Sequence, residues 1–312
     1  MKTSSPKTAL CSRKLPAKIV YHLHTAYLFS CSDLEAIVMA PFIFALLASQ
    51  AAPLLSMGDP PCSIPILMRA PQMIIWSWSG LLLFNIHNQR HRHSVEEDAV
   101  NKPWRPIPSG RLTSEQATVV LLCLYPLNLI VSLAVGGLVP LAVITTFSVW
   151  NNEFQDQSGG FLKNIHNGMG ITAFLAGPLE IATANSIFSG QAIAASWLGV
   201  IAMAITCTIH VQDLRDMEGD AVAGKRTIPM LMGEMNARLF VALAVAFWSA
   251  FGCWFWDNWM DGVLMAGLGL TLISIMVGIR TRAGDRLSYR LWAPWLLALA
   301  LLPYMKSLRW GQ

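Results

Sequence analysis

The chain has 312 residues, of which 54% are hydrophobic and 13% are charged, and its mean hydropathy is +0.48. Soluble domains usually carry about 25% charged residues, so this composition argues against a soluble fold and indicates a polytopic membrane protein. The formal net charge of +4 comes without arginine–aromatic repeats or zinc-ligand spacings, so no nucleic-acid partner is expected.

The first 30 residues form a basic segment that contains five lysine and arginine residues. They lack an apolar core followed by a cleavage site, so they differ from a secretory signal peptide. We expect residues 1–30 to stay in the cytosol, with an interfacial helix near residues 16–30. The remaining residues, 31–312, are expected to form a single transmembrane domain.

Long apolar runs follow one another through the rest of the chain, separated by polar connections. An α-helix needs about 20 apolar residues to cross a bilayer. The runs predict nine spans, at residues 34–54, 66–88, 115–135, 137–151, 165–185, 191–211, 236–256, 260–280 and 290–306. The predicted fold is therefore an all-α, polytopic bundle of membrane helices.

The basic residues are distributed unevenly between the two sides of these predicted spans. All but three of the 22 lysine and arginine residues lie in the N-terminal segment or in connections that nine spans would place on the same face. Such an excess marks the cytosolic side. We therefore expect an integral membrane protein, with the endoplasmic reticulum as its membrane and with its N-terminus in the cytosol.

A cluster of carboxylates follows the sixth predicted span, in the stretch DLRDMEGDAVAGKRTIP at residues 213–229. Asp213, Asp216 and Asp220 are spaced i, i+3 and i+7, which puts them on one helix face. Carboxylates at this density suit Mg²⁺, which bridges carboxylates to substrate phosphates. The alternative is a solvated acidic helix end that is neutralised by neighbouring basic residues.

A second cluster of charges follows the second predicted span. Residues 96–98 are all acidic, and they precede the proline-rich turn NKPWRPIPSGR at residues 101–111, which carries Lys102, Arg105 and Arg111. The prolines restrict the turn, so these cations are held in position for a phosphate group. Two acidic helix ends that are each followed by basic residues predict a site for a magnesium-bound diphosphate. Two ordinary cytosolic loops are the alternative.

These two stretches resemble the two aspartate-rich motifs of the UbiA superfamily of intramembrane prenyltransferases. DAVNKPWRPIPSGR at residues 98–111 is similar to the end of the first motif and its turn, and DLRDMEGD is similar to the second motif. The first motif is typically NDxxDxxxD, whereas the matching positions here are Arg90, His91, Ser94 and Asp98. Either the helix is locally shifted, or the metal ligands have moved to Glu97 and Asp98.

The resemblance implies nine helices around a central cavity, with the active-site mouth on the cytosolic face. It also implies a Mg²⁺ ion held by carboxylates, with Asp98, Asp213, Asp216 and Asp220 as the catalytic residues and Glu97 as a further ligand. The expected diphosphate contacts are polar and basic side chains near the same mouth, namely Asn88, Lys102, Arg105, Arg111, Lys163 and Lys225.

Within the cavity, aromatic faces stabilise carbocations as they do other cations. The candidate lining residues are aromatic or polar side chains in apolar runs: Trp76, Phe84, Trp150, Asn167, Phe174 and Glu180. Ordinary packing or an interfacial position is the alternative for each aromatic residue, and a structural hydrogen bond is the alternative for Glu180.

With this altered first motif, the chain resembles the fungal branch of the superfamily, which includes membrane-bound sesquiterpene cyclases. This resemblance implies Mg²⁺-dependent ionisation of farnesyl diphosphate, its cyclisation to a sesquiterpene and the release of diphosphate. An aromatic prenyltransferase on the same scaffold is the first alternative. A non-catalytic membrane transporter or scaffold is the second.

Overall fold

The computed structural model describes residues 15–154, 160–222 and 226–310, and every element in these ranges is helical. The elements in chain order are α2 (Leu15–Ser30), η1 (Glu35–Met39), α3 (Ala40–Ala48), η2 (Ser49–Ala51), α4 (Ser63–Gln89), α5 (Arg92–Asn101), α6 (Ser114–Val135), α7 (Leu138–Val149), η3 (Trp150–Phe154), α8 (Gly160–Thr183), α9 (Ile193–Thr208), α10 (Val211–Val222), α11 (Ile228–Met232), α12 (Glu234–Trp256), α13 (Gly262–Gly278), α14 (Arg282–Ala300) and α15 (Leu302–Trp310). The predicted all-α fold is confirmed.

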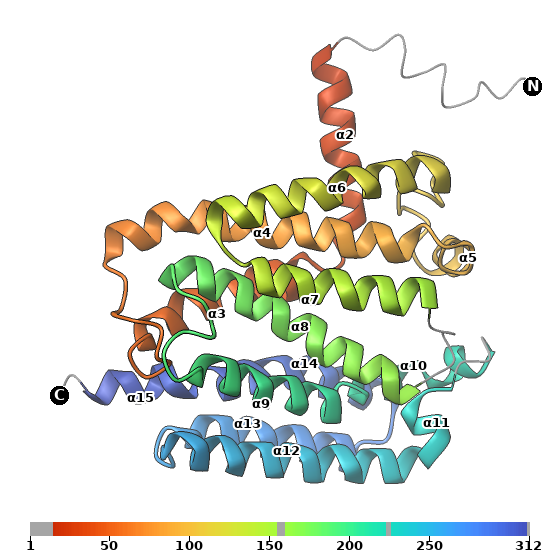
Figure 1. Ribbon diagram of the computed structural model, residues 1–312. Helices are drawn as coiled ribbons and strands as arrows, with labels where there is room; N and C mark the ends of the chain where they lie inside the picture. The colour runs from red at the N-terminus through yellow and green to blue at the C-terminus, as the bar shows by residue number, and fades with distance from the viewer. Residues whose placement is uncertain (1–14, 155–159, 223–225, 311–312) are drawn as a thin grey trace, which may run out of the picture.

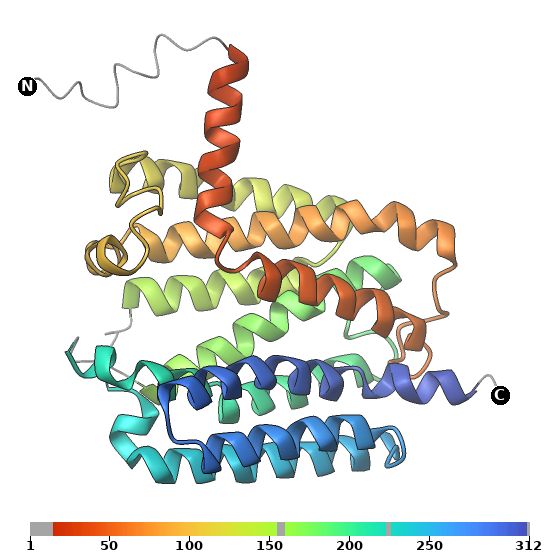
Figure 2. The ribbon, with the colours of Figure 1, turned by 180° about the vertical axis from the view of Figure 1, so that it is seen from behind.

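Most of the long helices run side by side along one direction, whereas α2 stands nearly upright against them (Figure 1). Seen from behind, α3, α14 and α15 are in front (Figure 2). Helix α8 runs obliquely through the middle of the bundle, where it contacts α3, α4, α7 and α9. Its residues are buried without interruption from Thr172 to Thr183, so α8 forms the centre of the core.

Two tight turns join long helices. Gly136 and Gly137 join α6 to α7 with φ angles of 102° and 80°. A Cβ atom at Gly137 would lie 2.7 Å from Nε1 of Trp76, so this turn requires glycine for space as well as for its backbone. Asp257 ends α12 in the left-handed region, with a φ angle of 46°.

Several helices of the bundle are suited by length and composition to cross a membrane. Among the described residues, α6, Ile193–Met217 and α12 are each long and apolar enough to cross a membrane. Two bent pairs meet this criterion together: Ala17–Ser30 with Glu35–Ala51, at 81°, and Arg282–Ala300 with Leu302–Arg309, at 46°. The protein is an integral membrane protein, and the count of nine spans stays a prediction.

Candidate active site

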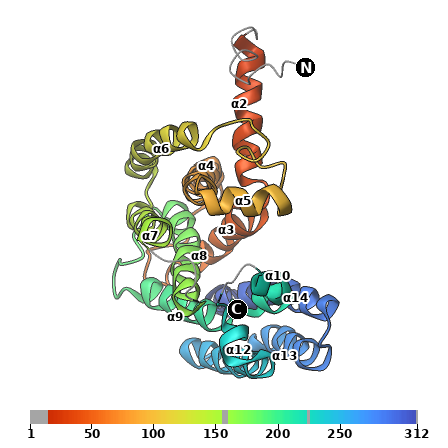
Figure 3. The ribbon, with the colours of Figure 1, turned by 90° about the vertical axis from the view of Figure 1, so that its right-hand side faces the viewer.

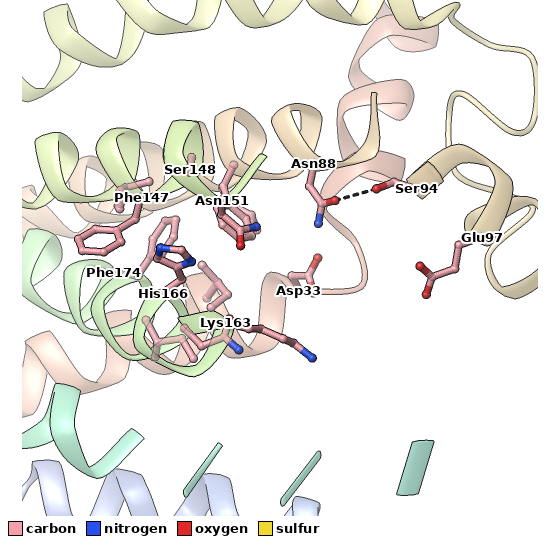
Figure 4. A pocket seen from close by; sticks show the side chains of 17 residues that line it. Asp33, Asn88, Ser94, Glu97, Phe147, Ser148, Asn151, Lys163, His166 and Phe174 are labelled. Carbon is pink, nitrogen blue, oxygen red and sulfur yellow. Dashed lines mark hydrogen bonds between the residues drawn. The ribbon is translucent and has the colours of Figure 1, made fainter. Parts of the chain in front are cut away.

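A cavity of about 400 Å³ lies among η1, α4, α5, α7 and α8. Its lining combines acidic, basic, amide and hydroxyl groups with aromatic and aliphatic side chains (Figure 4). The residues that line it are Asp33, Ile37, Leu81, Phe84, Asn88, Ser94, Glu97, Ile144, Phe147, Ser148, Asn151, Lys163, His166, Asn167, Gly170, Ile171 and Phe174. Its size lies within the range of about 300–1,000 Å³ that is typical of ligand pockets.

Both carboxylates and several other polar side chains lie toward one side of this cavity, which we call the polar end (Figure 4). It comprises Asp33, Asn88, Ser94, Glu97 and Lys163. The Ser94 hydroxyl donates a hydrogen bond to Oδ1 of Asn88, at 3.0 Å, and so links α5 to the end of α4. Acidic, amide and basic groups therefore meet where a charged ligand group would lie.

The opposite side of the cavity, which we call the aromatic end, is formed by Phe147, His166 and Phe174 (Figure 4). Phe147 and His166 meet edge to face, with ring centroids 5.4 Å apart. Phe84 also lines the cavity, together with aliphatic residues from η1, α4, α7 and α8. Such a surface suits a hydrocarbon chain and can stabilise a positive charge on it.

The first acidic motif divides between the cavity and the proline-rich turn. Glu97 lines the cavity. Asp98 is only 6% exposed, and both of its oxygens accept hydrogen bonds from Nη1 of Arg105, at 2.8 and 2.7 Å. Arg105, which the sequence suggested as a diphosphate contact, is therefore committed to Asp98 because a buried carboxylate needs a cationic partner.

The other two cations of the turn also have positions that sequence alone did not indicate. Arg111 donates to Oγ1 of Thr25 and to the carbonyl oxygen of Tyr21, at 3.1 and 3.2 Å, and its guanidinium lies over the Tyr21 ring. It thus attaches the turn to α2 rather than reaching the cavity. Lys102 is half-buried directly after α5.

Within the described residues, an ion pair between Asp213 and Lys163 connects the second acidic motif to the cavity. Asp213 is only 4% exposed, and its Oδ1 lies 3.1 Å from Nζ of Lys163, which lines the polar end. Asp216 is exposed and pairs with Arg215 at 3.0 Å. The side chain of Asp220, on α10, and all of Lys225 lie outside the described residues.

Helices α5 and α10, which carry the two acidic motifs, lie at the same end of the bundle (Figure 1). The view onto that end shows both helices facing the viewer, with α8 beside them (Figure 3). The two motifs are therefore on the same side of the molecule as the polar end of the cavity.

The predicted cavity residues separate into two groups. Phe84, Asn167 and Phe174 line the cavity, whereas Trp76, Trp150 and Glu180 are not among its lining residues. Trp76 packs behind Phe174, with ring centroids 6.4 Å apart, and donates from Nε1 to Oγ of Ser132 at 2.8 Å.

Trp150 and Glu180 have other neighbours. Trp150 is 47% exposed, and its ring meets the edge of His166 with centroids 5.7 Å apart. Oε1 of Glu180 accepts hydrogen bonds from the backbone of Ile187 at 2.9 Å and from the Ser186 hydroxyl at 3.1 Å. Glu180 thus holds the connection that follows α8, which is the structural alternative noted from the sequence.

Asp33 is a cavity residue that sequence reasoning missed. It precedes η1 and has no motif around it, but Nδ2 of Asn85 donates to its Oδ2 at 2.9 Å. Asn85 and Gln89, one helical turn apart on α4, both donate to the carbonyl oxygen of Phe29, at 3.0 and 2.9 Å. These two amides fix the break after α2 so that Asp33 faces the polar end.

Arg90 and His91, which occupy the first two matching positions of the family's first motif, lie close to Glu153 of η3. Arg90 forms an ion pair with Glu153, and Nε2 of His87 and of His91 lie 3.5 and 3.6 Å from the same carboxylate oxygen. Burial lowers the pKa of His91, Arg90 lowers it further, and Glu153 opposes the shift. The group could hold a metal ion by spacing, but the Arg90 guanidinium already neutralises its only carboxylate.

The donors near the polar end fit the chemistry of Mg²⁺, which prefers oxygen ligands and keeps several waters. Asp33 and Glu97 offer carboxylate oxygens. Asp98 and Asp213 lie beside them, each paired with a basic side chain. All of these donors are hard oxygens, so the set suits magnesium better than a transition metal.

Two proteins of known activity are similar to most of this chain. Fumagillin β-trans-bergamotene synthase of Aspergillus fumigatus is 28% identical over 298 residues, which cover 95% of this chain and 96% of that protein. Polyprenyl transferase eriF of Hericium erinaceus is 29% identical over 74% of this chain and 77% of that protein.

A solved structure of a UbiA homolog from Archaeoglobus fulgidus, bound to GPP and Mg²⁺, matches with a TM-score of 0.55 and 14% identity. The match covers 85% of this chain and 98% of that one. At this identity it shows that the fold is similar and nothing more. The family model described as the UbiA prenyltransferase family matches residues 38–301. The protein therefore belongs to the UbiA prenyltransferase family of membrane enzymes that use prenyl diphosphates.

Proposed function

We propose that this protein is a membrane-bound, Mg²⁺-dependent terpene cyclase that ionises farnesyl diphosphate and cyclises the chain to a sesquiterpene. The observation that carries the proposal is a single cavity with a polar end and an aromatic end. The similarity to a terpene synthase over 95% of the chain supports it. We treat residues 31–312 as one catalytic domain.

At the polar end, Lys163 donates a hydrogen bond to the diphosphate. Its ion pair with Asp213 is kept. Asn88 is a further donor, since its amide nitrogen is separate from the oxygen that Ser94 occupies. The magnesium ligands in this proposal are Asp33 and Glu97, which line the polar end, together with the motif carboxylates Asp98, Asp213, Asp216 and Asp220. When bound, the ion supplies positive charge that stabilises the leaving diphosphate.

At the aromatic end, Phe84, Phe147 and Phe174 shape the prenyl chain and face the positive charge that develops on it. Apolar walls also exclude water, which would otherwise capture the cation before the ring closes. The protein thus separates two tasks along one cavity. Its charged groups hold the diphosphate, and its aromatic groups direct the hydrocarbon.

The direct test is incubation of the purified protein in lipid with farnesyl diphosphate and Mg²⁺, without an aromatic acceptor. A cyclase gives a volatile hydrocarbon and releases one diphosphate for each product molecule. Recovery of only substrate or farnesol would reject cyclisation. Geranyl and geranylgeranyl diphosphates, assayed in parallel, decide which chain length the cavity prefers.

An aromatic prenyltransferase is the second candidate, and the similarity to polyprenyl transferase eriF favours it. On this hypothesis diphosphate release depends on an added aromatic acceptor, and the product contains both partners. A transporter or scaffold without catalysis is disfavoured by membership of an enzyme family. We further propose that the polar end opens to the cytosol and that the membrane is the endoplasmic reticulum.

A further inference from the structure

His166 on α8 is a buried polar residue that the proposed chemistry has not yet used. It is 7% exposed and lines the cavity, yet neither of its ring nitrogens has a hydrogen-bond partner within the described part of the chain. A buried polar atom without a partner typically costs about 1–3 kcal/mol. Such groups are rare in native proteins, and a catalytic or binding role is one of the few reasons for keeping them.

The surroundings of His166 are aromatic. Its ring meets the edges of Phe147 and Trp150, with centroids 5.4 and 5.7 Å away. Ser148, which also lines the cavity, has a buried hydroxyl without a partner among the described residues. The imidazole is therefore held in place by rings, and none of the described residues uses either of its nitrogens.

His166 also lies apart from the acidic groups of the cavity. It stands beside Phe174 at the aromatic end, whereas Asp33, Asn88 and Glu97 lie toward the other side (Figure 4). A prenyl diphosphate bound as proposed would place its charged group at the polar end and its hydrocarbon beside His166. The ring is thus positioned near the carbon skeleton rather than near the leaving group.

We infer that His166 is the general base that ends the cyclisation by removing a proton from the last carbocation. This inference rests on the proposed cyclase function. A C–H bond next to the cationic carbon breaks, and its electron pair forms the carbon–carbon double bond of the product. The proton moves to the lone pair of the unprotonated ring nitrogen, and the imidazolium returns it to water after the product leaves.

Other bases near the cavity are less suitable for this step. Glu180 already accepts two hydrogen bonds and does not line the cavity. Asp33 and Glu97 lie at the polar end. Ser148 has an acceptor oxygen, but a hydroxyl is a far weaker base than a neutral imidazole.

The test compares His166→Phe and His166→Gln with the wild type and with His22→Phe, the same substitution at an exposed histidine on α2. Each protein is incubated with farnesyl diphosphate and Mg²⁺, and both released diphosphate and hydrocarbon are measured. A general base contributes about 10²–10⁴-fold. We therefore expect both His166 variants to keep releasing diphosphate, while the native hydrocarbon formed per diphosphate falls by about 100-fold.

The missing hydrocarbon should reappear as alcohols formed by water capture or as olefins with a displaced double bond. His22→Phe should retain the wild-type ratio of hydrocarbon to diphosphate. An unchanged ratio and product in both His166 variants would overturn the inference, as would loss of diphosphate release in both, which would assign the ring to ionisation or folding. A wild-type protein that releases no diphosphate without an acceptor would instead contradict the proposed function itself.

Discussion

Arg105 and Asp98 show how a charge expected to bind substrate can be needed by the protein itself. The two-oxygen contact from Arg105 is made to a carboxylate that is almost fully buried. Breaking a buried pair by removing one partner leaves an uncompensated charge, which typically costs about 3–5 kcal/mol. The turn after α5 therefore depends on Arg105 for its stability.

We predict that Arg105→Ala lowers the thermal unfolding temperature of the protein in lipid or detergent. The change in unfolding free energy should approach about 3 kcal/mol, because Asp98 stays buried without its partner. The double variant Asp98→Asn/Arg105→Ala should recover part of this loss. Wild-type thermal stability in Arg105→Ala would show that the pair is dispensable.

Unlike Arg105, Lys163 lines the cavity. It is half-exposed and contacts Asp213. We predict that Lys163→Met weakens inhibition by inorganic diphosphate by about tenfold, because hydrogen bonds to charged groups are worth about 1.5–3 kcal/mol. Lys163→Arg keeps the charge and should retain most of the affinity. Equal inhibition constants for the wild type and Lys163→Met would remove this residue from the diphosphate site.

The sequence indicated which residue types could bind a diphosphate better than it indicated where those residues lie. The acidic and basic residues of both motifs could be singled out because they cluster directly after predicted spans. Asp33 was not, since its place depends on hydrogen bonds from a distant helix to the break after α2. His166 looked like any isolated histidine in an apolar helix, and only burial without a partner distinguishes it.

At the scale of elements, α8 positions both ends of the cavity, because it carries Lys163, His166 and Phe174. Its fit against α9 depends on a glycine. A Cβ atom at Gly168 would lie 2.6 Å from the carbonyl oxygen of Ala202 and would also collide with the Thr206 hydroxyl. Backbone atoms of a packed helix cannot move aside, so any side chain here pushes α8 away from α9.

We predict that Gly168→Ala destabilises the protein by about 1–3 kcal/mol, the usual effect of overpacking. It should also reduce turnover, because Lys163 and His166 move with α8. The control is Gly199→Ala on α9, where no atom lies within 4 Å of the added Cβ and helix propensity improves. Thermal melting of the two variants should move in opposite directions, and equal effects would argue against the close contact.

Apolar periodicity located the helices but not how they bend. The last predicted span, residues 290–306, is in fact two helices, α14 and α15, that break at Leu301. Helix α14 begins earlier than predicted, where the Thr281 hydroxyl accepts a hydrogen bond from the backbone of Gly284 at 3.2 Å. The sequence before the apolar run is polar, so hydropathy alone could not extend the helix to this cap.

On the scale of the whole molecule, distant parts of the chain share one end of the bundle. Helices α5 and α10 are separated in sequence by four α-helices and the π-helix η3, yet both lie at the same end of the bundle (Figure 3). Sequence alone gave the order of the helices but not which faces enclose a cavity, because lipid-facing and core-facing residues of these helices are equally apolar. The family resemblance implied a central cavity and the side of its mouth, but not the faces that enclose it.

We propose that one cavity binds the diphosphate at its polar end and the prenyl chain at its aromatic end. The most direct test is an experimental structure of the protein in lipid with Mg²⁺ and farnesyl thiodiphosphate, an analogue that resists ionisation. We expect the diphosphate beside Lys163 and Glu97, and the farnesyl chain against Phe147, His166 and Phe174. An analogue bound outside this cavity, or with its diphosphate among the aromatic rings, would contradict this assignment of the two ends.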